Sequence, residues 1–237
     1  MFAAVLKLAL FRPVARALAA LAGAAALAAG AAATVQAAEC RAPFPAPTTD
    51  LVEKQGEVRF SNGFSGPQLE RKRRQAGSAA TPGADWHPVG LMGRDMVWGF
   101  RIQVQAHPLE RGYCVGLAHA EMTIGFERID VYVDRRYRAG TCAYQAILDH
   151  ENQHVRNFRD TLAAHLPALR QTLEKEAAAA RPITAASPGP AADHFIRHLR
   201  RRLDPMVSRI QKEAAALDRA LDSPESYQAT QARCDDW

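Results

Sequence analysis

The sequence lacks a strong excess of charge of either sign. It contains 30 Lys and Arg against 25 Asp and Glu, a formal charge of +5. Three of the basic residues, Lys7, Arg12 and Arg16, lie in the first 38 residues, which contain no acidic residue, so the remainder has 27 against 25. Nucleic-acid-binding domains normally show a clustered basic excess. We therefore expect no nucleic acid partner.

One long apolar run occurs, and it lies at the start of the chain. Residues Ala17 to Ala33 are nearly all Ala, Leu and Gly, follow a basic segment, and lead into the small-residue site Val35-Gln36-Ala37. This order is typical of a cleaved signal peptide, whereas a membrane anchor is usually richer in leucine. The pattern predicts a signal peptide over residues 1–38. We expect a periplasmic or secreted protein with no stable membrane insertion after cleavage.

The cysteines are few and widely spaced, with no Cys-x-x-Cys pair to suggest a thiolate metal site. Four of them in an exported chain predict two disulfides, for which three pairings exist. We expect Cys114–Cys142, which would join a strand to the start of a helix, and Cys40–Cys234, which would join the two ends.

Residues 39–237, about 199 in all, are enough for a single domain with a substantial core. No internal repeat is visible. The segment at about 66–85 is rich in Gly, Pro and Ser and contains the run Arg71-Lys72-Arg73-Arg74, so we expect a mobile surface loop there. The remainder is expected to be an α+β domain.

Alternating apolar residues predict short strands before residue 134. The expected strands are Glu57 to Phe64, Met96 to Gln105, Tyr113 to Ile124 and Ile129 to Val133, with Gly112 and Gly125 between them. Their short connections favour a small antiparallel sheet over parallel crossovers.

At Gly140-Thr141 the apolar period changes from two to 3.6 residues, with Thr141 as the expected N-cap. A long helix is predicted from there to about Ala180, kinked at Pro167. A second long helix, from about Ala191 to Leu221, is expected to fold back on the first as a hairpin.

The first helix contains the motif His150-Glu151-Asn152-Gln153-His154, of the form His-Glu-x-x-His. Histidines four residues apart project from one face of a helix, one turn apart, and can bind one Zn2+. The chemistry predicts His150 and His154 as zinc ligands and Glu151 as the general base on a zinc-bound water.

A catalytic zinc site needs a third protein ligand. Asp160 follows His154 by six residues, which in an unbroken helix means a turn of about 240° and a rise of about 9 Å, away from the metal. The other route is an acidic residue of the second helix, since the hairpin register brings the motif level with about residues 217–221. The candidates there include Glu213, Asp218, Asp222 and Glu225. The sequence leaves the choice between the two routes open.

The segments Gly140-Thr141-Cys142-Ala143-Tyr144 and Ile147 to Val155 resemble a family of bacterial exported proteins described as predicted secreted zinc-dependent proteases. The resemblance extends from about Val89 to Leu173. It implies a zincin-like fold, with His150 and His154 as zinc ligands and Glu151 as general base. In related proteins a histidine near the C-terminus completes the site, and this chain has no histidine after His198.

Two hypotheses follow for the function. The first is an exported zinc-dependent metallohydrolase, most simply a peptidase acting on a polypeptide substrate. The second is a non-catalytic, disulfide-stapled envelope protein that acts as a binding module, with a degenerate or weak metal site at His150 and His154. The oligomeric state cannot be inferred from the sequence.

Overall fold

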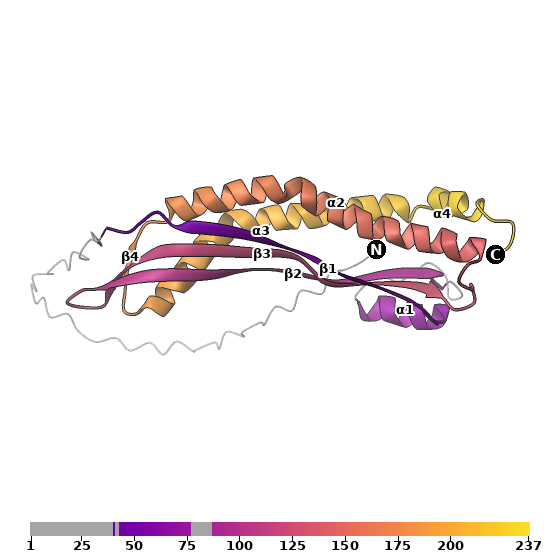
Figure 1. The fold of residues 1–237 in the computed structure, drawn as a ribbon, viewed down its shortest axis with the longest axis horizontal. Helices are drawn as coiled ribbons and strands as arrows, with labels where there is room; N and C mark the ends of the chain where they lie inside the picture. Colours follow the sequence, from indigo (N-terminus) through magenta and orange to yellow (C-terminus); the bar gives the residue numbers. More distant parts are fainter. Residues whose placement is uncertain (1–39, 41–42, 77–86) are drawn as a thin grey trace, which may run out of the picture.

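A computed structural model describes residue 40, residues 43–76 and residues 87–237 of the chain. The expected signal peptide, residues 1–38, lies outside the described residues. Within them the protein is an α+β structure of one mixed sheet and four helices (Figure 1). The elements in chain order are β1 (Thr48–Phe64), α1 (Gly66–Gln75), β2 (Gly90–Pro108), β3 (Tyr113–Asp134), α2 (Cys142–Ala179), β4 (Ile183–Ala185), α3 (Pro188–Leu221) and α4 (Pro224–Gln231).

The sheet is built around the long central strand β3. Strand β2 pairs with it antiparallel along its whole length, through a tight connection in which Leu109 N donates to Gly112 O at 3.0 Å. Strand β1 pairs with β3 in parallel, so the expectation of a purely antiparallel sheet was wrong. A short connection predicts antiparallel pairing only for the two strands that it joins, as it does for β2 and β3. Strand β1 pairs with β3 and not with β2, the next strand in the chain, so the short connections did not determine its direction.

The strands are longer than predicted, and β3 joins two of the predicted strands into one. Gly125, expected to separate them, lies inside β3 with φ +139°, and a Cβ there would collide with the backbone carbonyl of Lys54. The glycine therefore permits a close approach of two strands rather than a turn. The β2 ladder shifts register beside it, between Asp95 and Met96.

One face of the sheet is covered by α2 and by most of α3, whereas α1 lies on the opposite side near the end where α2 begins (Figure 1). The core between helices and sheet contains Met122 and Ile124 of β3, Phe158 and Leu162 of α2, and Leu203 of α3, all almost fully buried. Burial of such side chains contributes about 1.5–3 kcal/mol each. The motif helix is thus fixed on the sheet by its apolar face.

The two long helices are close to those predicted, and both contain their proline, Pro167 in α2 and Pro205 in α3. They pack side by side in opposite directions. Glu176 near the end of α2 pairs with His198 near the start of α3, and His165 pairs with Glu213 further along. Among the described residues no helix is long and apolar enough to cross a bilayer.

The expected mobile loop at about 66–85 is partly a helix. Residues 66–75 form α1, which begins at a Ser65–Gln68 capping box and buries Leu69 completely. Glu70 pairs with Arg73 at 2.7 Å, and the basic run falls in the last turn, where positive charge complements the helix dipole. The composition of this segment did not indicate a helix, because Leu69 is the one leucine that attaches α1 to the core. Residues 77–86 lie outside the described residues.

Both disulfides form, but neither expected pairing is right. Cys40 bonds to Cys114, and Cys142 bonds to Cys234. The reason is the length of β3, which rises by about 3.3 Å per residue. Cys114 is the second residue of β3 and Cys142 follows the far end of the strand, so the strand holds these two residues far apart. The second disulfide joins the first residue of α2 to the segment after α4.

Candidate metal centre

Helix α2 presents His150 and His154 on one face, one turn apart, with ring centroids 5.1 Å from each other. Both are buried, at 8% and 2% exposure. The helix starts where the sequence predicts: Thr141 Oγ1 accepts a hydrogen bond from Tyr144 N at 3.2 Å. The cap fixes the start of the helix about two turns before the motif. The buried apolar residues Ile147, Val155 and Phe158 lie beside the histidines and pack the helix into the core.

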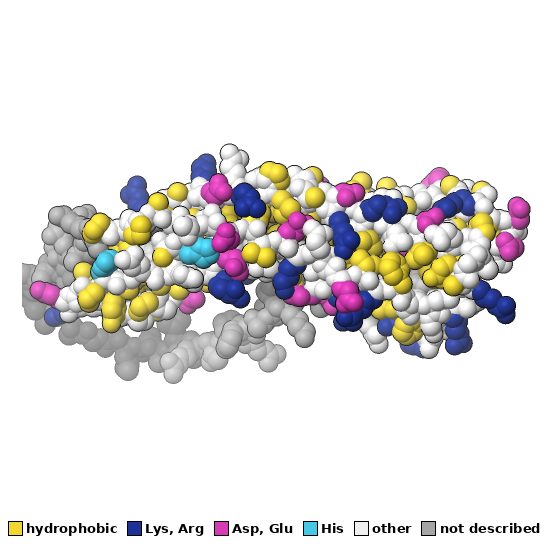
Figure 2. All heavy atoms as spheres, in the orientation of Figure 1, with side chains coloured by type: hydrophobic (Ala, Val, Ile, Leu, Met, Phe, Trp, Pro, Cys, Tyr) yellow, Lys and Arg dark blue, Asp and Glu magenta, His cyan; other side chains and the backbone are white. Residues whose placement is uncertain are grey.

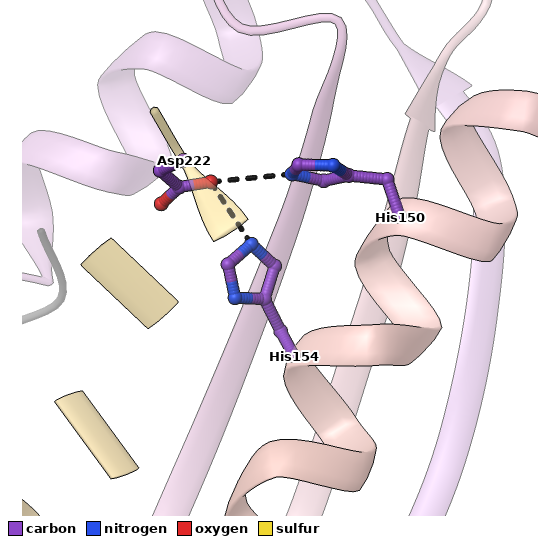
Figure 3. A group of neighbouring side chains, drawn as sticks. All are labelled: His150, His154 and Asp222. Atoms are coloured by element: carbon purple, nitrogen blue, oxygen red, sulfur yellow. Dashed lines mark hydrogen bonds and ion pairs between the residues drawn. The ribbon is translucent and has the colours of Figure 1, made fainter. Parts of the chain in front are cut away.

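Asp222, the C-cap residue of α3, completes a group of three (Figure 3). Its Oδ1 lies 3.2 Å from His150 Nε2 and 3.1 Å from His154 Nε2. One donor atom from each of the three residues lies within 4.8 Å of the others. Both rings point toward the carboxylate, so three ligand atoms from two helices converge on one point.

Two of the other third-ligand candidates, Asp160 and Glu213, lie apart from this group. Asp160 borders a separate hollow with His165 and Glu213, and Glu213 pairs with His165 at 2.6 Å. Asp218 faces Nδ1 of His154, whereas Asp222 faces its Nε2. The structure therefore groups Asp222 with the two histidines, and Asp160 and Glu213 stand apart from them.

The donor set and its spacing fit a metal ion. Three ligands each about 2.0–2.1 Å from a tetrahedral Zn2+ stand about 3.3–3.4 Å from one another. The distances of 3.1 and 3.2 Å between the carboxylate oxygen and the two imidazole nitrogens are close to that spacing. The group of His150, His154 and Asp222 can therefore hold a metal ion.

Asp218 supports this group from one turn earlier on α3. Its Oδ1 accepts a hydrogen bond from His154 Nδ1 at 2.8 Å and another from Asn157 Nδ2 at 3.3 Å. A histidine that donates from Nδ1 to a carboxylate turns its unprotonated Nε2 toward a metal, a common arrangement around metal sites. Behind Asp218, Arg94 Nη1 lies 3.9 Å from its Oδ2, and the guanidinium lies over the Phe158 ring at 3.1 Å from the centroid.

The electrostatics of the group favour positive charge between the carboxylates. Burial acts to lower the pKa of His154, but hydrogen bonds to Asp218 and Asp222 outweigh it and raise that pKa to about 10. For Asp222, burial acts to raise the pKa, and the two histidines instead hold it well below its usual value. Either protons or a cation must balance these buried carboxylates.

Glu151 lies between the two histidines in sequence and is 5% exposed. Burial raises its pKa to about 7, against the opposing effect of His154 and His150. Gly90, the first residue of β2, allows this position, since a Cβ there would collide with Glu151 Oε1. A carboxyl group with a pKa near 7 is suited to exchanging protons at neutral pH.

Tyr227 of α4 was not identified from the sequence. Its ring stacks on His150 at 5.3 Å between centroids, and its hydroxyl donates to Asp222 Oδ1 at 3.1 Å. Burial raises the pKa of its hydroxyl well above the ordinary value. No local motif marks this tyrosine: it reaches the site because Ser223 caps a new short helix directly after α3.

A pocket of about 260 Å³ opens beside these residues. His150, Glu151 and Tyr227 form its inner wall, and the start of β2 forms another. The possible metal site and the buried carboxylic acid therefore adjoin a space that a ligand can enter.

The chain matches no protein-family model, and comparisons with curated proteins and with solved structures likewise found no match. A function for this protein consequently has to be argued from its own residues.

Proposed function

We propose that this protein is an exported zinc-dependent metallohydrolase, most simply a peptidase. The observation that supports the proposal is the convergence of His150, His154 and Asp222 beside a pocket whose wall contains the buried Glu151. Three protein ligands with an open side are typical of catalytic zinc sites, whereas structural sites have four. The donor set, two imidazoles and a carboxylate, suits zinc.

A Zn2+ held there would polarise a substrate carbonyl and lower the pKa of a water molecule. Glu151 accepts the proton of the attacking water on its carboxylate and later returns a proton to the leaving amine. Its ionised form at neutral pH is favoured by a neighbouring cation, which opposes the effect of burial. On the same side of the pocket, Tyr227 donates its hydroxyl hydrogen to Asp222 Oδ1 at 3.1 Å and so helps to hold that ligand in position.

The arrangement of elements is also similar to that of zincin-type peptidases, in which a sheet precedes the motif helix and a later element supplies the third ligand. The family resemblance leads one to expect a histidine late in the chain. In this protein Asp222 takes that place. Two disulfides are typical of oxidising compartments and agree with export to the periplasm or the medium.

The test is metal analysis and peptide cleavage by protein purified without a histidine tag. We expect one Zn2+ per chain and cleavage of a casein or peptide-library substrate. In Glu151→Gln the metal should remain while the cleavage rate falls about a hundredfold to ten-thousandfold, since a general base is lost. Glu174→Gln, the same change at an exposed position of the same helix, is the matched control and should behave as wild type.

Equal cleavage by wild type and Glu151→Gln would remove the catalytic role. Absence of stoichiometric zinc would instead favour the non-catalytic envelope protein, in which the buried histidines and aspartates stabilise the fold as a charge-balanced network.

A further inference from the structure

Part of the pocket lining comes from α4 and the segment after it. Trp237 lines the pocket together with Thr230 and Gln231 of α4. Tyr137, from the turn between β3 and α2, stands beside Trp237 in an edge-to-face contact with 6.0 Å between ring centroids. On the face seen in Figure 2, acidic and basic side chains are interspersed, so charge does not single out a binding surface there. The pocket is the better candidate.

The two aromatic rings form a wall that offers few polar atoms. Trp237 Nε1 donates to the backbone oxygens of Gln231 at 2.8 Å and Cys234 at 3.0 Å, so the one polar atom of the indole is already bonded. Ile147 and Val89 extend the apolar surface across the pocket. Trp237 is 44% exposed, so a ligand can reach the ring.

Three contacts fix this wall to the catalytic side. The Cys142–Cys234 disulfide joins the segment to the first residue of α2. Arg233 pairs with Asp149, the residue before the motif, at 2.7 Å. The Tyr227 hydroxyl bonds to Asp222. The position of Trp237 is therefore set relative to Glu151 by covalent and polar contacts, which makes the wall a preorganised part of the site.

The size and lining of the pocket define its occupant. At about 260 Å³ it is below the roughly 300–1,000 Å³ of pockets that enclose whole small-molecule ligands, and it suits a single large side chain. We propose that this pocket binds a large apolar or aromatic side chain of the polypeptide substrate, next to the bond to be cleaved, and that Trp237 and Tyr137 determine this preference. The placement next to the cleaved bond rests on the proposed function, whereas binding of the side chain does not.

The experiment uses three peptides of one sequence that differ only in a central Phe, Ala or Lys. Binding is measured by fluorescence anisotropy on zinc-loaded Glu151→Gln protein, and cleavage is measured on wild type. We expect the Phe peptide to bind about tenfold more tightly than the Ala peptide, as burial of most of one ring implies. The Lys peptide should bind no better than the Ala peptide.

Variants then test whether the preference for the Phe peptide depends on the Trp237 ring. Trp237→Ala, placed in the Glu151→Gln background for binding, should reduce the preference for Phe over Ala to about threefold or less. Trp237→Phe retains a ring and should preserve most of it. Phe60→Ala removes an aromatic side chain that is 57% exposed on β1 and should leave the preference unchanged.

The outcomes separate the two proposals. Preferential binding of the Phe peptide without cleavage by wild type would retain the pocket assignment and overturn the hydrolase. Cleavage with equal rates and equal affinities for all three peptides would retain the hydrolase and overturn the pocket assignment. Equal or undetectable binding of the peptides, or a preference that survives Trp237→Ala, would likewise overturn it.

Discussion

Within the described part of the chain, the buried charges on α1 and those around His154 differ in how they are balanced. On α1 the single carboxylate of Glu70 meets the guanidinium groups of Arg73 and Arg74, at 2.7 and 2.6 Å. At the other site Glu151, Asp218 and Asp222 surround two imidazoles, and the nearest guanidinium is 3.9 Å from Asp218. The first group is complete within one helix. The second has three carboxyl groups, and of these Arg94 pairs with Asp218.

The difference separates a structural ion pair from a candidate site. Glu70 has its pKa lowered to about 2 by Arg73 and Arg74, as expected of a carboxylate that stays ionised in a stable pair. In the group around His154 the pKa values shift in opposite directions: the pKa of Glu151 is raised to about 7, and the pKa of Asp222 is lowered. Buried groups with divergent pKa values next to a pocket are typical of functional sites.

The largest expected effect is on metal binding in His154→Ala. The variant loses one of three ligands and leaves Asp218 and Asp222 buried without their partner, so we expect zinc affinity to fall at least about a thousandfold. Chelator competition measures it. His165→Ala, a histidine of the same helix that pairs with Glu213, is the control and should bind zinc as wild type. Retention of stoichiometric zinc by His154→Ala would place the metal elsewhere.

The second effect is the pH dependence of zinc affinity. His154 must release a proton to bind metal, and in the metal-free fold its pKa is about 10 rather than 6.5. Zinc affinity should therefore rise about tenfold per pH unit from pH 6 to 8, roughly a hundredfold in all. Calorimetry in buffers of different ionisation enthalpy counts the protons released.

The same shift gives the metal-free protein the opposite trend. A histidine with a raised folded pKa stabilises the fold fully below its unfolded pKa of 6.5, and this contribution is lost as pH rises through about 10. The excess stability of the metal-free wild type over His154→Gln should shrink in that window. Affinity independent of pH, with no proton release, would contradict the proposed role of His154.

A smaller effect is expected from Asp218→Asn. The substitution keeps the shape of the side chain but removes the charge that orients His154 through Nδ1, so zinc affinity should fall about tenfold to a hundredfold while one ion per chain still binds. Complete loss of zinc would mean that Asp218 is itself a ligand, and Asp222→Asn measured in parallel shows which aspartate matters more.

The smallest effect is expected from Glu70→Gln in the complete ion pair. The amide oxygen can still accept a hydrogen bond from Arg73, so unfolding in urea should show a loss of about 1 kcal/mol near neutral pH, with zinc affinity unchanged. Because the folded pKa of Glu70 is lowered, its contribution is present above pH 4.5 and is lost as pH falls toward 2. A change in zinc affinity would show that the two groups are coupled.

Local features were predictable from the sequence, and distant ones were not. His150, Glu151 and His154 are fixed by helical spacing alone, and the long helix from Thr141 follows from its apolar stripe. The assignment of Asp222 required the register of two helices that both contain a proline, across 68 residues of chain. The register placed the contact near residues 217–221 but could not choose a single carboxylate.

The wrong disulfide pairing follows from the length of β3, which is a single strand although Gly125 suggested a break. The direction of β1 was wrong for another reason, because β1 pairs in parallel with β3, whereas the short connections had favoured an antiparallel sheet. A glycine that serves a close approach to Lys54 cannot be told from a turn glycine without the neighbouring strand. Tyr227 and Trp237 were not predicted as site residues, because the disulfide that brings their segment to α2, Cys142–Cys234, was not the expected pairing.

The most direct test of the proposed centre is zinc K-edge X-ray absorption on untagged protein, compared between wild type and Asp222→Ala. We expect one Zn2+ per chain, bound by two imidazole nitrogens and by oxygen atoms at about 2.0–2.1 Å, with no sulfur ligand. The Asp222→Ala variant should show fewer ligands or no zinc. An unchanged spectrum in Asp222→Ala, or a wild-type chain without bound zinc, would contradict the centre formed by His150, His154 and Asp222.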